Sequence, residues 1–88
     1  MSHRHRTKAT TVDPRSSEAM ALLLIADEGP QRRREIKEWV GFRSDGAATA
    51  LCTRLAGKGL IARTGYLWHL TLAGMAEAER IDPQEVAA

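Results

Sequence analysis

Basic side chains gathered between residues 31 and 64 are the groups in this chain best suited to chemistry, and that chemistry is the binding of a polyanion. The segment holds eight Lys and Arg against three Asp and Glu, although the whole chain carries a net charge of only +2. Guanidinium groups can bind phosphate through two parallel hydrogen bonds, and a one-sided basic surface is typical of nucleic-acid-binding proteins. An ordinary solvated helix face is the alternative interpretation of the same charges.

Acidic residues lie on either side of this basic segment. Residues 16–30 contain three acidic residues and no basic one, and residues 65–88 contain four acidic residues and one arginine. The first fifteen residues are basic again, with Arg4 and Arg6 near the start. Because the positive charge is segregated along the chain, the sequence favours a polyanionic partner over a uniformly solvated surface.

Residues that could support catalysis or bind a metal are few and scattered. The sequence has no phosphate-binding loop, no Gly-rich nucleotide motif and no carboxylate pair at a useful spacing. Cys52 falls on an apolar helix stripe, and His3 and His5 have only His69 and Cys52 to complete a metal shell. We therefore expect a protein that is not an enzyme and that uses neither cofactor nor metal.

The cellular location is suggested by what the chain lacks. Its N-terminus has no apolar stretch typical of a secretory signal, and its longest apolar run, residues 19–26, is too short to cross a bilayer. A single cysteine cannot form an internal disulfide, which suits a reducing compartment. These features predict a cytoplasmic protein, associated with the nucleoid or, if the chain is viral, in the host cytoplasm.

Two helices are expected before residue 41. Asp13-Pro14 is typical of a helix start and Gly29-Pro30 of a helix end, which predicts a first helix over about 13–28. The second is expected over about 32–40, and its apolar residues at i, i+3 and i+4 should face the core. Those residues are Ile36, Trp39 and Val40, whereas Arg33 and Lys37 are expected on the opposite face, and Phe42 should follow into the core.

A third helix is expected to begin at Ser44 or Asp45, both good N-cap residues, and to end at Gly59. At 3.6 residues per turn it has two contrasting faces. The buried face holds Ala48, Leu51, Cys52 and Leu55. The opposite face has small side chains: Gly46, Thr49, Ala50, Thr53 and Gly57, with Arg54 at its edge.

A short hairpin and a last helix complete the predicted domain. Residues 60–63 and 66–70 are expected to pair across a Thr64-Gly65 turn, with Tyr66, Trp68 and Leu70 on one face; which face is exposed stays open. Thr71 should cap a helix to about residue 81, and Asp82-Pro83 should end it. The predicted organisation is a flexible basic arm (1–12), one domain (13–82) and a short tail (83–88).

This order of elements predicts an α+β, mostly α fold: a winged helix-turn-helix with three helices, a short two-stranded wing and a C-terminal helix. Residues 17–82 resemble winged-helix transcription regulators of the MarR-like type and the short phage or archaeal winged-helix repressors. The matching residues are Glu35-Ile36, Gly41, Thr49, Leu55, Gly59-Leu60-Ile61, Arg63 and Leu70-Thr71-x-x-Gly74. The long terminal helices typical of MarR-type proteins are missing here, so a ligand-sensing role does not carry over.

The resemblance implies double-stranded DNA as the partner, a recognition helix over about 44–58 in the major groove and a wing over 60–70 on the adjacent backbone or minor groove. The residues expected to hold the DNA backbone are Arg32, Arg33, Arg34, Lys37 and Lys58. Those expected to read bases are Arg43, Ser44, Thr49, Thr53 and Arg54. The expected wing contacts are Arg63, Thr64 and Tyr66, and the expected arm contacts are Arg4 and Arg6.

The corresponding function is transcriptional regulation, by a repressor that occludes a promoter, and a homodimer would imply a palindromic site. Two other functions stay open. One is a protein-interaction module of a larger assembly, because the small-residue face of the third helix also suits close packing against a protein. The other is nonspecific binding of RNA or single strands, which exposed Tyr66 and Trp68 would favour.

Overall fold

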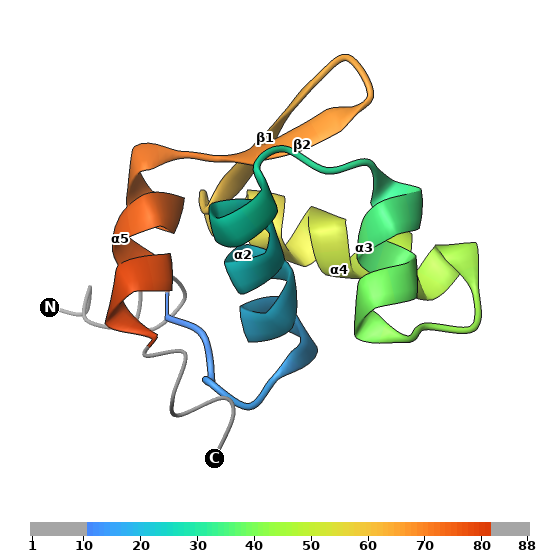
Figure 1. Cartoon of the computed structure of the whole chain (residues 1–88), viewed down its shortest axis with the longest axis horizontal. Helices are drawn as coiled ribbons and strands as arrows, with labels where there is room; N and C mark the ends of the chain where they lie inside the picture. Colours follow the sequence, from blue (N-terminus) through green and yellow to red (C-terminus); the bar gives the residue numbers. More distant parts are fainter. Residues whose placement is uncertain (1–10, 82–88) are drawn as a thin grey trace, which may run out of the picture.

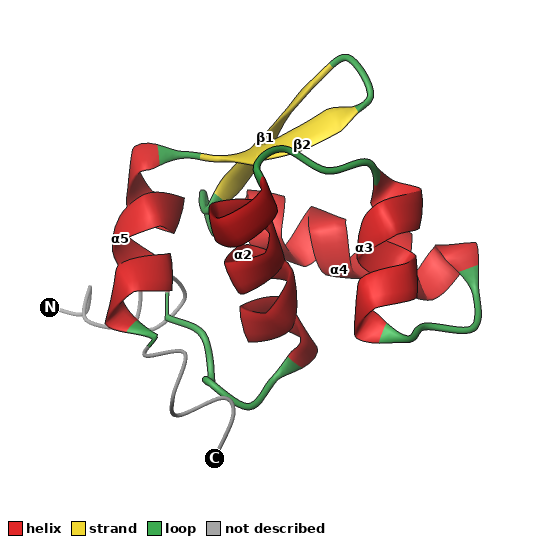
Figure 2. Ribbon diagram, in the orientation of Figure 1, coloured by secondary structure: helices red, strands yellow, loops and turns green. Residues whose placement is uncertain are grey.

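The computed structural model describes residues 11–81, which form a small α+β, mostly helical fold. In chain order this part contains α2 (Ser17–Glu28), α3 (Arg33–Val40), α4 (Asp45–Gly57), β1 (Ile61–Thr64), β2 (Leu67–Leu70) and α5 (Leu72–Arg80). The two strands form one antiparallel sheet. Figure 2 shows this hairpin standing above the layer of helices. No helix among residues 11–81 is long and apolar enough to span a membrane.

The core is built around α2, which lies between α5 and α3 and in front of α4 (Figure 1). Leucine and isoleucine from every helix but α5 fill it, and Leu60 and Ile81 close it from the chain segments beside the hairpin and after α5. The predicted buried stripe of α4 is confirmed, since its four residues are all buried. Its predicted small-residue face is exposed throughout.

The first helix begins later than Asp13-Pro14 predicts. Ser16 is the N-cap of α2, and its side chain accepts a hydrogen bond from the Ala19 amide. The Asp13 carbonyl accepts from the Ser16 amide, and the Asp13 carboxylate accepts from the Arg15 amide. Asp13 thus stabilises a turn that precedes the helix, because its acceptors are used before the helical amides are reached.

Val12 belongs to the core, although the sequence places it in a flexible arm. Its side chain is 4% exposed. Its amide donates to the Glu77 carboxylate at 2.8 Å, and its carbonyl accepts from Arg80 at 2.8 Å. Arg80 also donates to Glu77, so one ion pair on α5 clamps the incoming chain. The other predicted arm residues except Thr11, the expected helix stop at Asp82-Pro83 and the tail 83–88 lie outside the described residues.

The orientation of α3 differs from the expected one. Ile36 is buried and Val40 partly buried, but Trp39 is 60% exposed, so its prediction as a core residue is wrong. Arg33 and Lys37 point toward α4, where they reach Asp45, instead of away from the core. The cause is the position of α4. It packs on the side of α3 that carries Arg33 and Lys37, and Trp39 lies on another side.

The hairpin turn lies one residue later than predicted. Arg63 pairs with Trp68 and Thr64 with Leu67, so the turn residues are Gly65 and Tyr66. Gly65 has a φ of 64°, and no other residue type has a positive φ in the described part of the chain. A hairpin turn with positive φ only at its first central position is type II′, which selects glycine there. Tyr66 is consequently a turn residue and not a strand residue.

The Leu-Thr-x-x-Gly motif has a structural explanation at the start of α5. The Thr71 hydroxyl accepts from the Gly74 amide at 3.0 Å and donates to the Gly59 carbonyl at 2.6 Å. A Cβ on Gly74 would lie 1.9 Å from the Leu60 carbonyl oxygen, so only glycine lets α5 approach the chain this closely. Thr71 therefore caps α5 as predicted, and Gly74 fixes its distance from the hairpin.

Candidate nucleic-acid interface

A backbone bridge places the arginine-rich start of α3 beside the hairpin. Gln31, in the link between α2 and α3, pairs with Trp68 of β2 in antiparallel fashion. The Gln31 amide donates to the Trp68 carbonyl at 3.0 Å, and the Trp68 amide donates to the Gln31 carbonyl at 2.7 Å. Arg32, the N-cap of α3, follows directly. The Glu35 carboxylate accepts a hydrogen bond from the Arg32 backbone amide at 2.7 Å and fixes the first turn of α3.

A groove of about 1160 Å³ runs between the start of α3, the exposed face of α4 and one face of the hairpin. Four of its twelve lining residues are arginines, and the other eight are threonine, small, aliphatic or aromatic residues. The lining consists of Arg32, Arg33, Arg34, Thr49, Cys52, Thr53, Ala56, Ile61, Ala62, Arg63, Tyr66 and Trp68. Seven of the residues predicted to contact DNA thus meet in one place: Arg32, Arg33, Arg34, Thr49, Thr53, Arg63 and Tyr66. We call this the basic groove.

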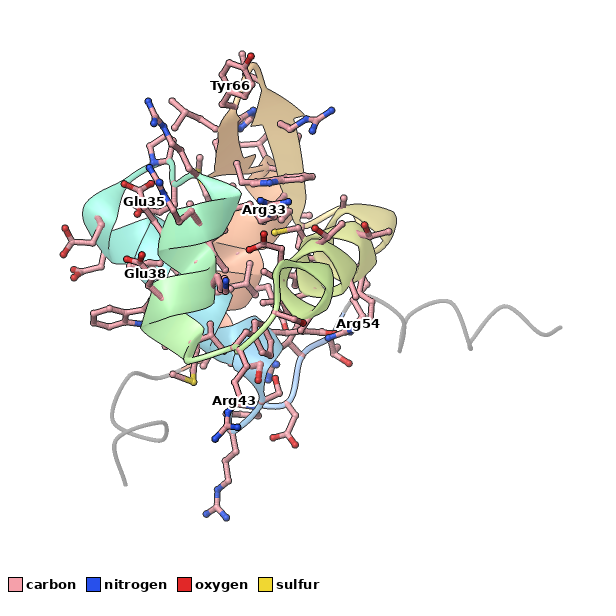
Figure 3. The ribbon with its side chains drawn as sticks, turned by 90° about the vertical axis from the view of Figure 1, so that its right-hand side faces the viewer. Arg33, Glu35, Glu38, Arg43, Arg54 and Tyr66 are labelled. Atoms are coloured by element: carbon pink, nitrogen blue, oxygen red, sulfur yellow. The ribbon has the colours of Figure 1, made fainter. Side chains whose placement is uncertain are left out.

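Arg32, Arg34 and Arg63 are available to an anionic ligand. All three are exposed, and none forms an ion pair with a carboxylate within residues 11–81. Three guanidinium groups that have no ion-pair partner in the described part of the chain concentrate positive potential over the groove. Arg33 is held more firmly, since it lies between α3 and α4 in Figure 3 and donates to the Thr49 hydroxyl at 3.4 Å.

Arg63 lies over the ring of Trp68, 5.7 Å from the ring centroid, in a cation–π contact. Trp68 is partly buried against the core, so its ring supports the arginine from below. The sequence predicts a role for Trp68 only in the single-strand alternative, and Trp68 is not among the predicted duplex contacts. The preference of a type II′ turn for glycine at its first central position could have revealed the contact between Arg63 and Trp68. A turn that begins at Gly65 makes these two residues cross-strand partners, whereas a Thr64-Gly65 turn would pair Arg63 with Tyr66.

Tyr66 occupies the tip of the hairpin and is 85% exposed. Figure 3 shows it at the end of the hairpin farthest from the helices. An exposed aromatic ring at the rim of a cationic groove can stack on a base or pack against a sugar. Thr64 also lies on the hairpin, where its hydroxyl is 3.0 Å from His69 Nε2, and it does not line the basic groove.

Lys37 and Arg33 share a carboxylate at the start of α4. Lys37 Nζ lies 3.0 Å and Arg33 Nη2 3.8 Å from the Asp45 carboxylate. The hydrogen bond from Lys37, together with the two positive charges, lowers the pKa of Asp45 below its ordinary value. Asp45 therefore stays ionised and offsets part of the positive charge beside the groove. Lys37 itself does not line the groove.

Arg54 and Lys58 are directed away from the groove. Both pair with Glu18 of α2, at 2.9 and 2.6 Å, and Lys58 also donates to the Thr11 carbonyl. Burial acts to raise the pKa of Glu18, but the hydrogen bonds and charges of these two cations outweigh it and lower that pKa. Figure 3 shows Arg54 on the side of α4 away from α3. These two residues hold α4 against α2.

Arg43 and Ser44 lie in the loop between α3 and α4, directly before the first residue of α4. Figure 3 shows Arg43 at the opposite end of the molecule from Tyr66. The Ser44 hydroxyl accepts from the Ala47 amide, as expected of an N-cap, so it is already used by the helix. Arg43 is exposed and forms no ion pair within the described range. Neither residue lines the basic groove, and Arg4 and Arg6 lie outside the described residues.

Chemically reactive groups near the groove are few. Cys52 lies at its floor, is buried as predicted, and burial raises the pKa of its thiol, which disfavours the nucleophilic thiolate. Within residues 11–81, no three His, Cys, Asp or Glu side chains gather as metal ligands do. The basic groove can contact a ligand through positive charges, threonine hydroxyls and aromatic rings.

Comparison of the chain with known proteins identifies no family. No protein-family model, curated protein or solved structure matches the chain.

Proposed function

We propose that this protein binds double-stranded DNA through the basic groove, with the arrangement of a winged helix-turn-helix. In this proposal α3 and α4 form the helix-turn-helix, α4 enters the major groove, and the hairpin acts as a short wing on the adjacent backbone or minor groove. The observation that carries the proposal is the meeting of Arg32, Arg34 and Arg63, unpaired within the described residues, beside the exposed face of α4.

The chemistry of the α4 face supports close approach to DNA. Gly46, Ala50 and Gly57 are exposed and have almost no side chain, so the helix backbone can come near the bases. Thr49 and Thr53 lie along the same face, and a threonine can hydrogen-bond a base edge or contact a thymine methyl. The arginines of α3 and of the hairpin would then hold phosphates and set the register.

The corresponding biological role is transcriptional regulation, with repression by occupation of a promoter. A homodimer would place two copies of α4 on a palindromic site, with half-sites about one helical turn apart. Site selection from random duplexes tests this role directly. An enriched palindrome supports a sequence-reading dimer, whereas steep salt dependence without an enriched motif would indicate a nonspecific binder.

The binding test uses fluorescence anisotropy on a labelled random duplex over a salt series, with Arg34→Gln, Arg63→Gln and the double variant. Each single change should lower the slope of log K against log salt by about one and weaken binding to all sequences. Arg15→Gln is the control, because it removes the same charge from a residue that does not line the groove. Equal effects of all three single changes would sink the groove assignment.

Binding to single strands is the second candidate, and the exposure of Tyr66 specifically favours it. A stacked base is lost when the ring is removed, so Tyr66→Ser should weaken single-strand binding by about tenfold if this candidate is right. If duplex binding carries the function, the same change has a smaller effect, because Tyr66 then serves only the edge of the interface. The ratio of single-strand to duplex affinity in wild type and Tyr66→Ser separates the two.

A further inference from the structure

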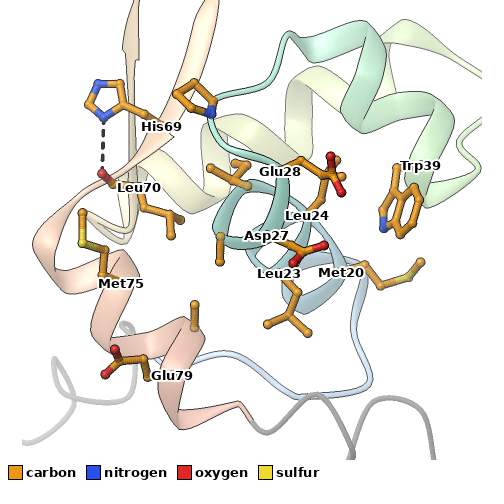
Figure 4. Close-up of a pocket in the computed structure, with 14 residues that line it drawn as sticks. Met20, Leu23, Leu24, Asp27, Glu28, Trp39, His69, Leu70, Met75 and Glu79 are labelled. Carbon is orange, nitrogen blue, oxygen red and sulfur yellow. Dashed lines mark hydrogen bonds between the residues drawn. The ribbon is translucent and has the colours of Figure 1, made fainter.

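A second groove lies along α2, on the far side of α3 from the basic groove. It has a volume of about 1110 Å³, and most of its surface is apolar. In Figure 4 its floor is α2, with Leu23 and Leu24, and its two walls are Trp39 of α3 and Met75 of α5. Met20 of α2 also lines it. We call this the apolar groove.

The walls of the apolar groove are exposed although they are hydrophobic. Trp39 is 60% exposed and Met75 is 49% exposed. Large apolar side chains clustered in a concave surface mark a contact site more often than scattered ones do. Tryptophan provides much of the binding energy at protein interfaces, and methionine adapts its shape to different partners.

The rim of the apolar groove is acidic. Asp27 and Glu28 lie at the end of α2 and Glu79 on α5, all exposed and all lining the groove. Within the described residues no lysine or arginine lines it, and these three carboxylates form no ion pair. An occupant that brought positive charge to the rim would therefore gain attraction that the free protein does not satisfy.

We propose that the apolar groove binds an amphipathic helix of a partner protein, with an apolar stripe flanked by Lys and Arg. A helix that lies along α2 between two walls would present residues at i, i+3, i+4 and i+7 to the floor, in the helix-in-groove mode. The charge of the rim selects the flanking residues. This inference is independent of the proposed DNA binding, because the two grooves share no residue.

The rim also argues against the other occupants. A symmetric second copy would bring the same patch to both sides, so three carboxylates would face three carboxylates. Like charges at such a contact cost affinity. Nucleic acids and anionic membranes are repelled for the same reason. A cationic helix is the occupant whose charge matches that of the groove.

The test uses the full chain, labelled with 15N, and a synthetic helical peptide of Leu and Lys about 14 residues long, which is about four turns. A second peptide carries Glu in place of every Lys. Titration calorimetry and amide chemical shifts are recorded with both. We expect the Leu/Lys peptide to bind about tenfold more tightly, with shifts along α2 and α5 and at Trp39.

Three variants make the result specific to the groove. Trp39→Ser should weaken binding of the Leu/Lys peptide strongly. Tyr66→Ser, which removes an even more exposed aromatic ring outside this groove, should not. The triple change Asp27→Lys, Glu28→Lys and Glu79→Lys alters only exposed side chains and should transfer the preference to the Leu/Glu peptide. Circular dichroism checks that each variant is folded.

Several results would overturn the proposal. Equal affinity for the two peptides would remove the role of the rim. Shifts confined to residues away from α2, Pro30, Trp39, the end of β2 (His69 and Leu70) and α5 would place binding elsewhere. Sedimentation of the free protein as a dimer that Trp39→Ser dissociates would assign the groove to a second copy instead. Unchanged peptide binding in both Trp39→Ser and the charge-reversed variant would likewise exclude it.

Discussion

The basic and apolar grooves have nearly the same volume, about 1160 and 1110 Å³, but opposite chemistry. The basic groove takes its charge from the start of α3 and from the hairpin, and the apolar groove takes its carboxylates from the end of α2 and from α5. The charge segregation along the sequence therefore becomes a segregation in space. In the two proposals, this small chain would present one surface to phosphates and another to a cationic protein segment.

The two grooves are also held together by different means. The basic groove depends on a backbone bridge between Gln31 and Trp68 and on the paired strands. The apolar groove depends on the seating of α5, which rests on Gly74 and on the clamp between Val12 and Glu77. Changes in α5 should therefore damage the apolar groove first and leave the hairpin, and with it the basic groove, less affected.

The largest expected effect comes from Gly74→Ala. The new Cβ would meet the Leu60 carbonyl oxygen at 1.9 Å, so α5 has to move. Overpacking of this kind costs about 1–3 kcal/mol, and each kcal/mol lowers the melting temperature of a domain of this size by about 4–8 °C. Thermal unfolding followed by circular dichroism measures the change. Ala73→Ser, at the exposed neighbour, is the control, and equal melting temperatures for the two variants would contradict the close approach.

The next effect concerns Glu77 and acid. The hydrogen bond from Arg80 holds the pKa of Glu77 below its ordinary value; burial opposes this and the Val12 amide assists it. A lowered folded-state pKa stabilises the protein above the unfolded pKa, and that contribution is lost as the pH falls below about 4.3. Glu77→Gln should cost about 1–3 kcal/mol at neutral pH and flatten the acid limb of the stability curve.

Urea unfolding at pH 7 and between pH 5 and pH 3 measures both parts of this prediction. Glu79→Gln is the matched control, because Glu79 is exposed on the same helix and forms no ion pair within residues 11–81. If Glu77→Gln lost stability in parallel with the wild type as the pH fell, the clamp would not be the titrating element.

Patterns in neighbouring residues, namely periodicity and helix-capping residues, predict the order and type of the helices and strands. The faces of α4, its Ser44 cap, the Thr71 cap of α5 and the order of elements all agree with the structure, because each depends on residues close in sequence. The prediction that Trp39 is a core residue is wrong because its burial depends on residues distant in the sequence. An eight-residue helix can bury either side of its apolar stripe, and the choice is made by where α4 packs, which no local pattern specifies.

The candidate site was predicted less completely than the fold. Arginine content indicated the basic segment, yet Arg54 and Lys58 turn out to pair with Glu18, forty residues or so away in the chain. Long-range ion pairs of this kind have no signature in a single sequence. The position of Trp68, by contrast, could have been predicted from the sequence. The preference of a type II′ turn for glycine sets the strand register, and that register places Trp68 under Arg63.

Arg54 and Arg63 provide a sharper comparison within the DNA proposal. Both are exposed arginines of the basic segment, but Arg54 pairs with Glu18 and Arg63 lines the groove. Arg63→Gln should weaken duplex binding by about fivefold at low salt, and Arg54→Gln by less than about twofold. Fluorescence anisotropy on one duplex measures both. The reverse order of effects would move the interface to the Glu18 side of α4.

The smallest effect is expected from Asp45→Asn, and its sign is informative. The carboxylate holds Lys37 at 3.0 Å and draws Arg33 toward the start of α4. Asparagine keeps a polar first turn but removes the charge, so both cations become available to phosphate and the potential over the groove rises. Duplex affinity should increase about two- to threefold at low salt, and the gain should vanish at high salt because exposed charges are screened.

The pH dependence of binding checks the same change in charge. Because the pKa of Asp45 is lowered, the wild type should reach the affinity of Asp45→Asn only in acid, once Asp45 is protonated. A loss of affinity in Asp45→Asn would mean that the carboxylate positions Arg33 for DNA instead of competing for it, and the basic groove would then owe its geometry to this ion pair.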